Sequence, residues 1–187
     1  MKSFRLMVIL VAILNCSQTI FFAAPAFCTS LPQKGGTLPA LELQAPSSAK
    51  EISYLGIPGP TFRISEIDCQ VLLVEVIGIY CPSCYRQAPL FNTLFSRIEK
   101  SKLKGKVKML ALAAGGSVAE IQYLNEQGPY SFPVVPDPSF LAHQLLGEPR
   151  TPFTMLVDPR EGRVLHTHMG VVEDIDAFLR LIASLVQ

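Results

Sequence analysis

A long apolar run that ends almost directly in a pair of cysteines constrains this chain more than any other feature. Residues 71–79 are aliphatic except for one glutamate and one glycine, a pattern typical of a strand that is covered on both faces. Cys81-Pro82-Ser83-Cys84 follows, and apolar residues then recur at helical spacing through about residue 100. The sequence therefore predicts a central strand, a turn that carries two cysteines, and a helix.

The remaining segments alternate between strand and helix patterns. Residues 107–113 predict a second buried strand, and Ser117 and Glu120 form the sequence signature of a helix N-terminus. Further along the chain we expect a helix at 117–127, a short helix at 140–146, a hairpin of strands 153–157 and 164–169, and a terminal helix from 175. The predicted class is α/β, with a central mixed β-sheet flanked by helices. Pro89 is expected to kink the helix that follows the cysteines.

The position of the two cysteines gives the first sulfur a distinct chemistry. Unpaired N–H groups and the positive end of the helix dipole stabilise a thiolate at a helix N-terminus. We therefore expect Cys81 to attack and Cys84, one turn into the helix, to resolve the mixed disulfide. Pro82 suits the first helical position because its φ is already helical. A structural zinc site needs four ligands, and no second cysteine pair with matching spacing exists, so a redox-active disulfide is favoured over metal.

The first residues predict export. Lys2 and Arg5 precede an apolar stretch, and the small residues at 24–26 offer a cleavage site, as in a secretory signal. Periplasmic export is the expectation, with an uncleaved membrane anchor as the alternative. The segment after the signal is rich in Ser, Pro, Gly and Ala and is expected to be extended. The predicted organisation is a signal peptide or anchor at 1–26, a linker at 27–50 and one folded domain at 51–187.

Taken in order, these segments resemble the thioredoxin superfamily and, within it, the periplasmic TlpA/ResA-like thiol:disulfide oxidoreductases. The resemblance covers about residues 55–187. The segments that carry it are 71–84, Pro89, 132–138 and Thr151-Pro152-Phe153-Thr154. It implies a thioredoxin-like fold for the domain. It also implies that Pro152 is a cis-proline facing the disulfide, and that the backbone of Thr151 pairs with the substrate chain.

Three positions depart from the family pattern. Tyr80 stands before the first cysteine where most relatives have tryptophan, and Gln87 replaces a glutamate that many relatives have. Glu75, within the apolar strand, offers a carboxylate where thioredoxins keep a buried aspartate. A carboxyl group in an apolar setting has a raised pKa, so we expect Glu75 to accept the proton of Cys84.

The other candidate ligands are two cysteines and two histidines. Cys28 and Cys69 could pair with each other, pair with a partner or stay free. His166 and His168 share one face of a predicted strand, which suggests copper binding, but a solvated hairpin face is the favoured interpretation.

Composition narrows the class of partner. The 187 residues carry a net charge of +1 and no long run of like charge, which argues against nucleic acid. The predicted function is exchange of the cysteine pair with client proteins that carry cysteines or disulfides. The family resemblance implies a reductant supplied by a membrane thiol carrier, whereas the residues alone leave an oxidase role open. No cofactor and no metal are expected. The alternative is a copper or haem-assembly chaperone that uses the same cysteines as ligands.

Overall fold

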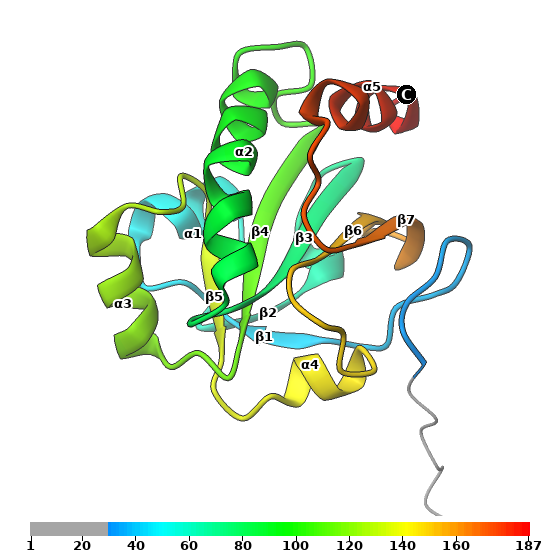
Figure 1. Cartoon of the computed structure of the whole chain (residues 1–187). Coiled ribbons are helices and arrows are strands. Elements are labelled where there is room, and N and C mark those ends of the chain that lie inside the picture. Colours follow the sequence, from blue (N-terminus) through cyan, green and yellow to red (C-terminus); the bar gives the residue numbers. More distant parts are fainter. Residues whose placement is uncertain (1–29) are drawn as a thin grey trace, which may run out of the picture.

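The computed structural model describes residues 30–187, and its centre is a mixed sheet of five strands in the order β5-β4-β3-β6-β7 (Figure 1). Within this sheet β3, β4 and β5 are parallel, whereas β6 is antiparallel to β3 and forms the predicted antiparallel hairpin with β7. The strands are β3 (Val71–Gly78), β4 (Val107–Ala114), β5 (Val134–Asp137), β6 (Phe153–Asp158) and β7 (Arg163–Met169). The expected central mixed sheet is confirmed, with β3 in the middle.

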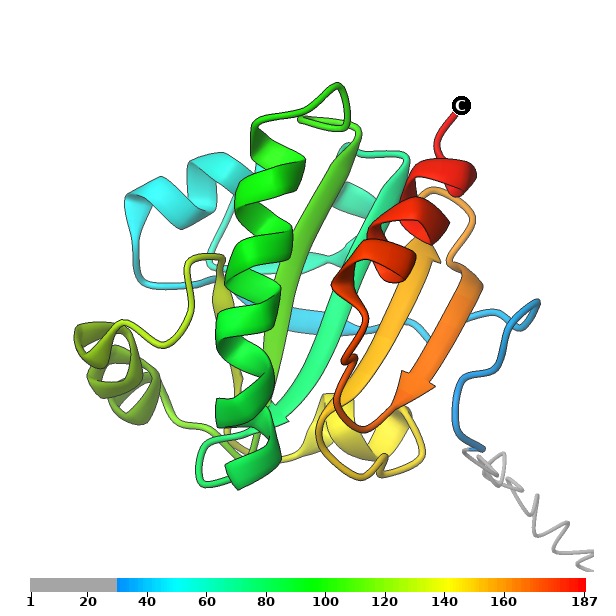
Figure 2. The ribbon, with the colours of Figure 1, turned by 45° about the horizontal axis from the view of Figure 1, so that its top comes forward.

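Helices cover both faces of this sheet. Helices α2 (Pro82–Glu99) and α5 (Ile175–Leu185) lie side by side on one face, and α3 (Val118–Gln127) contacts the edge strand β5 (Figure 2). The residues buried on the other face come from the sheet and from a second group of elements. These are β1 (Glu42–Gln44), α1 (Ala49–Leu55), β2 (Thr61–Arg63), the 3₁₀ turn η1 (Ile64–Glu66) and α4 (Leu141–Leu145).

Alternation along β3 divides the core into two layers. Leu73 and Ile77 point to the layer under α2 and α5, whereas Leu72, Val74 and Val76 point to the opposite layer. All the strand residues from 71 to 77 are buried, which explains the unbroken apolar run in the sequence. By the same alternation Glu75 faces the layer of α2.

The prediction of an extended linker at 27–50 is wrong for its second half, which is part of the folded domain. Residues 35–38 run along β7, where the Gly35 amide donates to the Val164 carbonyl at 2.8 Å. The chain then crosses to β1, which pairs with β2 and contacts β5. Leu41 and Leu43 are 3% and 2% exposed. The folded domain therefore begins well before residue 51, because these leucines fill the core layer opposite α2.

The local signals for helix ends agree with the structure. Ser117 and Glu120 form the predicted capping box of α3, and Pro82 is at the first turn of α2. Pro89 lies inside α2, and the predicted kink stays a prediction. The predicted signal peptide at 1–26 and Cys28 fall outside the described residues. Between residues 30 and 187, no helix is both long and apolar enough to cross a membrane.

Candidate active site

The two cysteines lie where β3 ends and α2 begins, and they form a disulfide. Cys81 is the N-cap of α2, and its sulfur accepts a hydrogen bond from the Cys84 amide at 3.2 Å. Such a bond, together with the helix dipole, stabilises negative charge on the first sulfur. Cys81 is partly exposed, whereas Cys84 is only 1% exposed. A second molecule can therefore reach Cys81 and not Cys84.

The segment before β6, which contains Thr151 and Pro152, lies next to the sulfur of Cys81. The Thr151–Pro152 peptide bond is cis, as the family resemblance implies. The Thr151 carbonyl oxygen lies 3.5 Å from the Cys81 sulfur. Gly78, at the end of β3, is next to both: a Cβ there would lie 3.4 Å from the Cys81 Cβ and 3.5 Å from the Thr151 Oγ1. Two segments distant in the sequence, 78–81 and 151–152, thus meet at one sulfur.

Behind the disulfide, a buried polar cluster links β3 to α2. Gln87 lies one turn after Cys84 and donates from Nε2 to Glu75 Oε1 at 2.7 Å. Its Oε1 accepts from the Val172 amide at 2.7 Å. Because a backbone N–H can only donate, it fixes the amide orientation of Gln87 and turns the NH₂ group toward Glu75. Thr154, opposite Glu75 on β6, lies 3.5 Å from the same nitrogen.

Burial raises the pKa of Glu75 to about 8, although the hydrogen bond from Gln87 opposes this shift. Glu75 is 0% exposed, and no described residue pairs with its Oε2. A carboxyl group with this pKa exchanges its proton near neutral pH. The expected burial of Glu75 is confirmed, and its role toward Cys84 stays a proposal.

The pairing of Gln87 with Glu75 was not predicted from the sequence, in which Gln87 stands where many relatives have an acid. A signal was available: Gln87 shares a helix face with Cys84, Ala88 and Phe91, all of which are buried. A polar residue on a buried helix face needs a partner. The identity of that partner depended on the register between α2 and β3, which spacing alone does not specify.

His166 and His168 lie on a half-buried face of β7. His166 lies under α5, with its ring centroid 6.1 Å from that of Phe178, and burial lowers its pKa. The expected solvated face is therefore only partly exposed, because α5 packs over His166. His168 pairs in register with Thr154, which pairs with Glu75, so the three form one row across the sheet. Within residues 30–187, no group of three or more His, Cys, Asp or Glu side chains is arranged to hold a metal ion.

Cys69 lies away from these groups and is buried, with no disulfide to any described residue. Burial raises the pKa of its thiol to about 11. The thiol is therefore protonated at neutral pH, and the predicted alternatives for pairing with Cys28 stay open.

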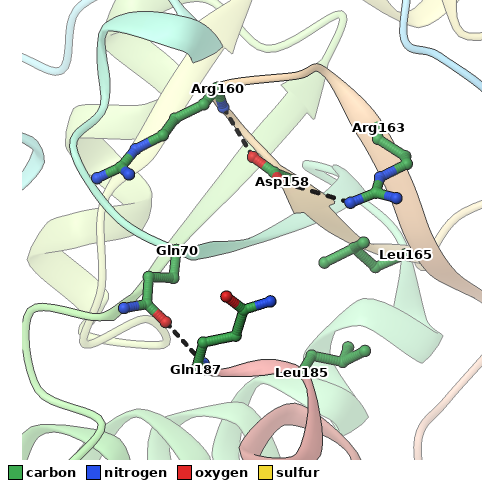
Figure 3. A pocket seen from close by; sticks show the side chains of 7 residues that line it. All are labelled: Gln70, Asp158, Arg160, Arg163, Leu165, Leu185 and Gln187. Atoms are coloured by element: carbon green, nitrogen blue, oxygen red, sulfur yellow. Dashed lines mark hydrogen bonds and ion pairs between the residues drawn. The ribbon is translucent and has the colours of Figure 1, made fainter.

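A separate hollow of about 210 Å³ lies at the opposite end of β3 from the disulfide (Figure 3). Gln70, which precedes β3, accepts a hydrogen bond from the Gln187 amide at 2.9 Å. Arg160 and Arg163 also line the hollow, but each has a carboxylate partner. Both arginines are therefore paired with carboxylates of the protein itself.

Comparisons with known proteins find thiol-disulfide oxidoreductases among the chains similar to this one. No family model matches the chain. The thiol-disulfide oxidoreductase ResA of Halalkalibacterium halodurans is 23% identical over 128 residues, which are 67% of this chain and 70% of that protein. This match to ResA agrees with the TlpA/ResA-like resemblance that the order of the sequence motifs indicates.

Solved structures share the fold. A DsbE-type thiol:disulfide interchange protein from Chlorobium tepidum matches with a TM-score of 0.66 and 22% identity, over 84% of this chain and 100% of that chain. A secreted disulfide oxidoreductase of Mycobacterium tuberculosis, described as homologous to E. coli DsbE, matches with a TM-score of 0.57 and 12% identity. That match covers 77% of this chain and 95% of the other. The thioredoxin-like fold expected for this chain is confirmed.

Proposed function

We propose that this chain, a TlpA/ResA-like member of the thioredoxin superfamily, is an exported thiol:disulfide oxidoreductase that reduces disulfides in client proteins. The observation that carries the proposal is the disulfide at the N-terminus of α2, with Cys81 partly exposed, Cys84 buried and the cis-proline segment beside the first sulfur. This arrangement supports attack by one sulfur and resolution by the other.

In the proposed reaction, the thiolate of Cys81 attacks a client disulfide and forms a mixed disulfide, and one client sulfur leaves as a thiolate. Cys84 then attacks the Cys81 sulfur, so the second client sulfur leaves and the protein becomes oxidised. Thr151 binds the client backbone beside Pro152. Glu75 takes the proton of Cys84 before the second attack. A membrane thiol carrier is the proposed donor that restores the dithiol.

Trapping tests the assignment of the two sulfurs. We expect Cys81→Ser to abolish exchange, and Cys84→Ser to accumulate mixed disulfides, because only Cys84 can release a client bound through Cys81. Non-reducing electrophoresis followed by mass spectrometry would identify both the adduct and the attached cysteine. Adducts on Cys84 in the Cys81→Ser protein, with none in the Cys84→Ser protein, would reverse the roles.

The direction of electron flow is tested by the reduction potential. As a reductant, the pair should equilibrate with glutathione at a potential more negative than that of the glutathione couple. Insulin reduction with the dithiol protein provides the matching activity measurement. A potential well above that of glutathione would assign the chain to disulfide formation instead.

Export is supported by the signal-like N-terminus and by the secreted relative from Mycobacterium tuberculosis. Mass analysis of the mature protein should find Phe27 as the first residue. An intact Met1 in the membrane fraction would indicate an anchor, and an intact Met1 in the cytosol would contradict export.

A further inference from the structure

A groove of about 340 Å³ opens beside the exposed sulfur. Cys81, Tyr80, Gly115, Glu120 and Phe140 are among the residues that line it. Tyr80 and Phe140 are its large side chains, and they are 80% and 45% exposed. Two exposed aromatic rings beside a reactive sulfur form an apolar surface at the place where a client must dock.

Phe140 is unusual in its backbone as well as in its exposure. Its φ is 58°, in the left-handed region, where a bulky residue is rare because its Cβ is crowded. Glycine would adopt this conformation at lower cost. The backbone therefore disfavours a phenylalanine here, and the part of the ring that is 45% exposed gains nothing from burial. Costly conformations of this kind concentrate at functional sites.

The ring of Phe140 is held in a fixed position against Gly115. The Asp137 carbonyl accepts hydrogen bonds from both the Gly115 amide, at 2.9 Å, and the Phe140 amide, at 3.0 Å. The Asp137 carboxylate binds the Ala142 and His143 amides at 3.1 and 2.9 Å. A Cβ on Gly115 would lie 2.1 Å from the Phe140 Cζ, so the ring packs where only glycine leaves room.

A hydrogen bond also holds the side chain of Tyr80 in place. Its hydroxyl donates to Glu120 Oε1 at 3.0 Å, and Glu120 is the third residue of α3 and part of its capping box. Hydrogen bonds from Ser117 and Tyr80 lower the pKa of Glu120. The groove therefore combines two positioned rings with a carboxylate that is ionised at neutral pH.

We infer that this groove receives the residue next to the client cysteine and selects an aromatic or large apolar side chain over an acidic one, with Phe140 as the specificity residue. The inference rests on the proposed function, because attack by Cys81 brings the client sulfur to this edge of the groove. The neighbouring client residue then contacts Tyr80 and Phe140. An acidic residue there would gain no apolar contact and would face the carboxylate of Glu120.

Activated peptides test this selection in one chemical step. The Cys84→Ser protein is mixed with peptides whose single cysteine forms a disulfide with thionitrobenzoate and whose neighbouring residue is Phe, Ala or Asp. The thiolate of Cys81 attacks the peptide sulfur, the bond to thionitrobenzoate breaks, and the coloured thionitrobenzoate anion leaves with the electron pair. We expect the Phe peptide to react roughly tenfold faster than the Ala peptide, the effect of burying part of a ring, and the Asp peptide slowest.

Variants of Phe140 separate recognition from folding. Phe140→Gly removes the ring and suits the positive φ, so Tm should stay equal or rise while the Phe-to-Ala rate ratio falls toward one. Phe140→Tyr should keep the ratio. Tyr123→Ala is the control, because Tyr123 is an aromatic residue on α3 that is 65% exposed and does not line the groove.

Two results would overturn the inference while leaving the proposed function intact: equal rates for the three peptides, or an unchanged rate ratio in the Phe140→Gly protein. If no peptide releases thionitrobenzoate, attack by Cys81 fails, and the proposed function is lost together with the inference.

Discussion

The carboxyl group of Glu75 lies in the middle of a fully buried strand, where a charge is costly. Its pKa is raised to about 8, so the folded protein holds a proton that the unfolded chain releases near pH 4.5. The contribution of Glu75 to the free energy of unfolding is fully present below the pKa that it has in the unfolded chain. It is lost as the pH rises through the pKa that it has in the folded protein. The free energy of unfolding should fall by up to about 1.4 kcal/mol per pH unit between those values, and Glu75→Gln should remove that slope.

The same variant tests the proton transfer. Glu75→Gln should leave the first attack by Cys81 nearly unchanged but slow client release and alter its pH profile, measured by stopped-flow with a preformed mixed disulfide. Unchanged release across pH would reject the role of Glu75, even if the stability slope disappeared as expected. The pH dependence of unfolding therefore tests the burial of Glu75, and the pH dependence of client release tests its role in proton transfer.

At the scale of a structural element, helix α3 depends on its capping box. Ser117 Oγ accepts from the Glu120 amide at 3.2 Å, and Glu120 Oε2 accepts from the Ser117 amide at 3.0 Å. Ser117→Ala should cost about 1 kcal/mol in urea unfolding, because an N-terminal donor loses its partner. Ser184→Ala in α5 is the matched control, since the Ser184 hydroxyl donates within its own helix and alanine is a good helix former. Equal stability of the two variants would contradict the capping role.

At the scale of the whole molecule, the N-terminal segment completes the core. Leu43 on β1 is 2% exposed, so Leu43→Ala should cost roughly 2–5 kcal/mol in the free energy of unfolding. Leu31→Ala is the control, because Leu31 is 37% exposed and should tolerate the change. A protein shortened to begin at residue 51 should be less stable than either variant. Full stability of that shortened protein, measured by thermal unfolding, would show that 30–50 is a linker after all.

Local sequence patterns predicted the elements whose structure depends on residues close together in the chain. The run from Val71, the cysteine pair and Pro82 predicted β3, the reactive turn and α2, because strand burial, helix capping and φ preference act within a few residues. The hairpin of β6 and β7 and the capping box of α3 were predictable for the same reason. The cis peptide bond before Pro152 was implied by the family resemblance and not by a local pattern.

Tertiary structure decided what depends on pairing between distant segments. β1 has only three residues, too few for a clear periodic signal, and its leucines are buried because the chain crosses the sheet there. Gln87 meets Glu75 through the register of α2 on β3, and Phe140 meets Gly115 through a single carbonyl of Asp137. The sequence by itself therefore determined where the reactive sulfurs are. Packing determined which acid lies behind them and which rings lie beside them, because those contacts join segments that no local pattern relates.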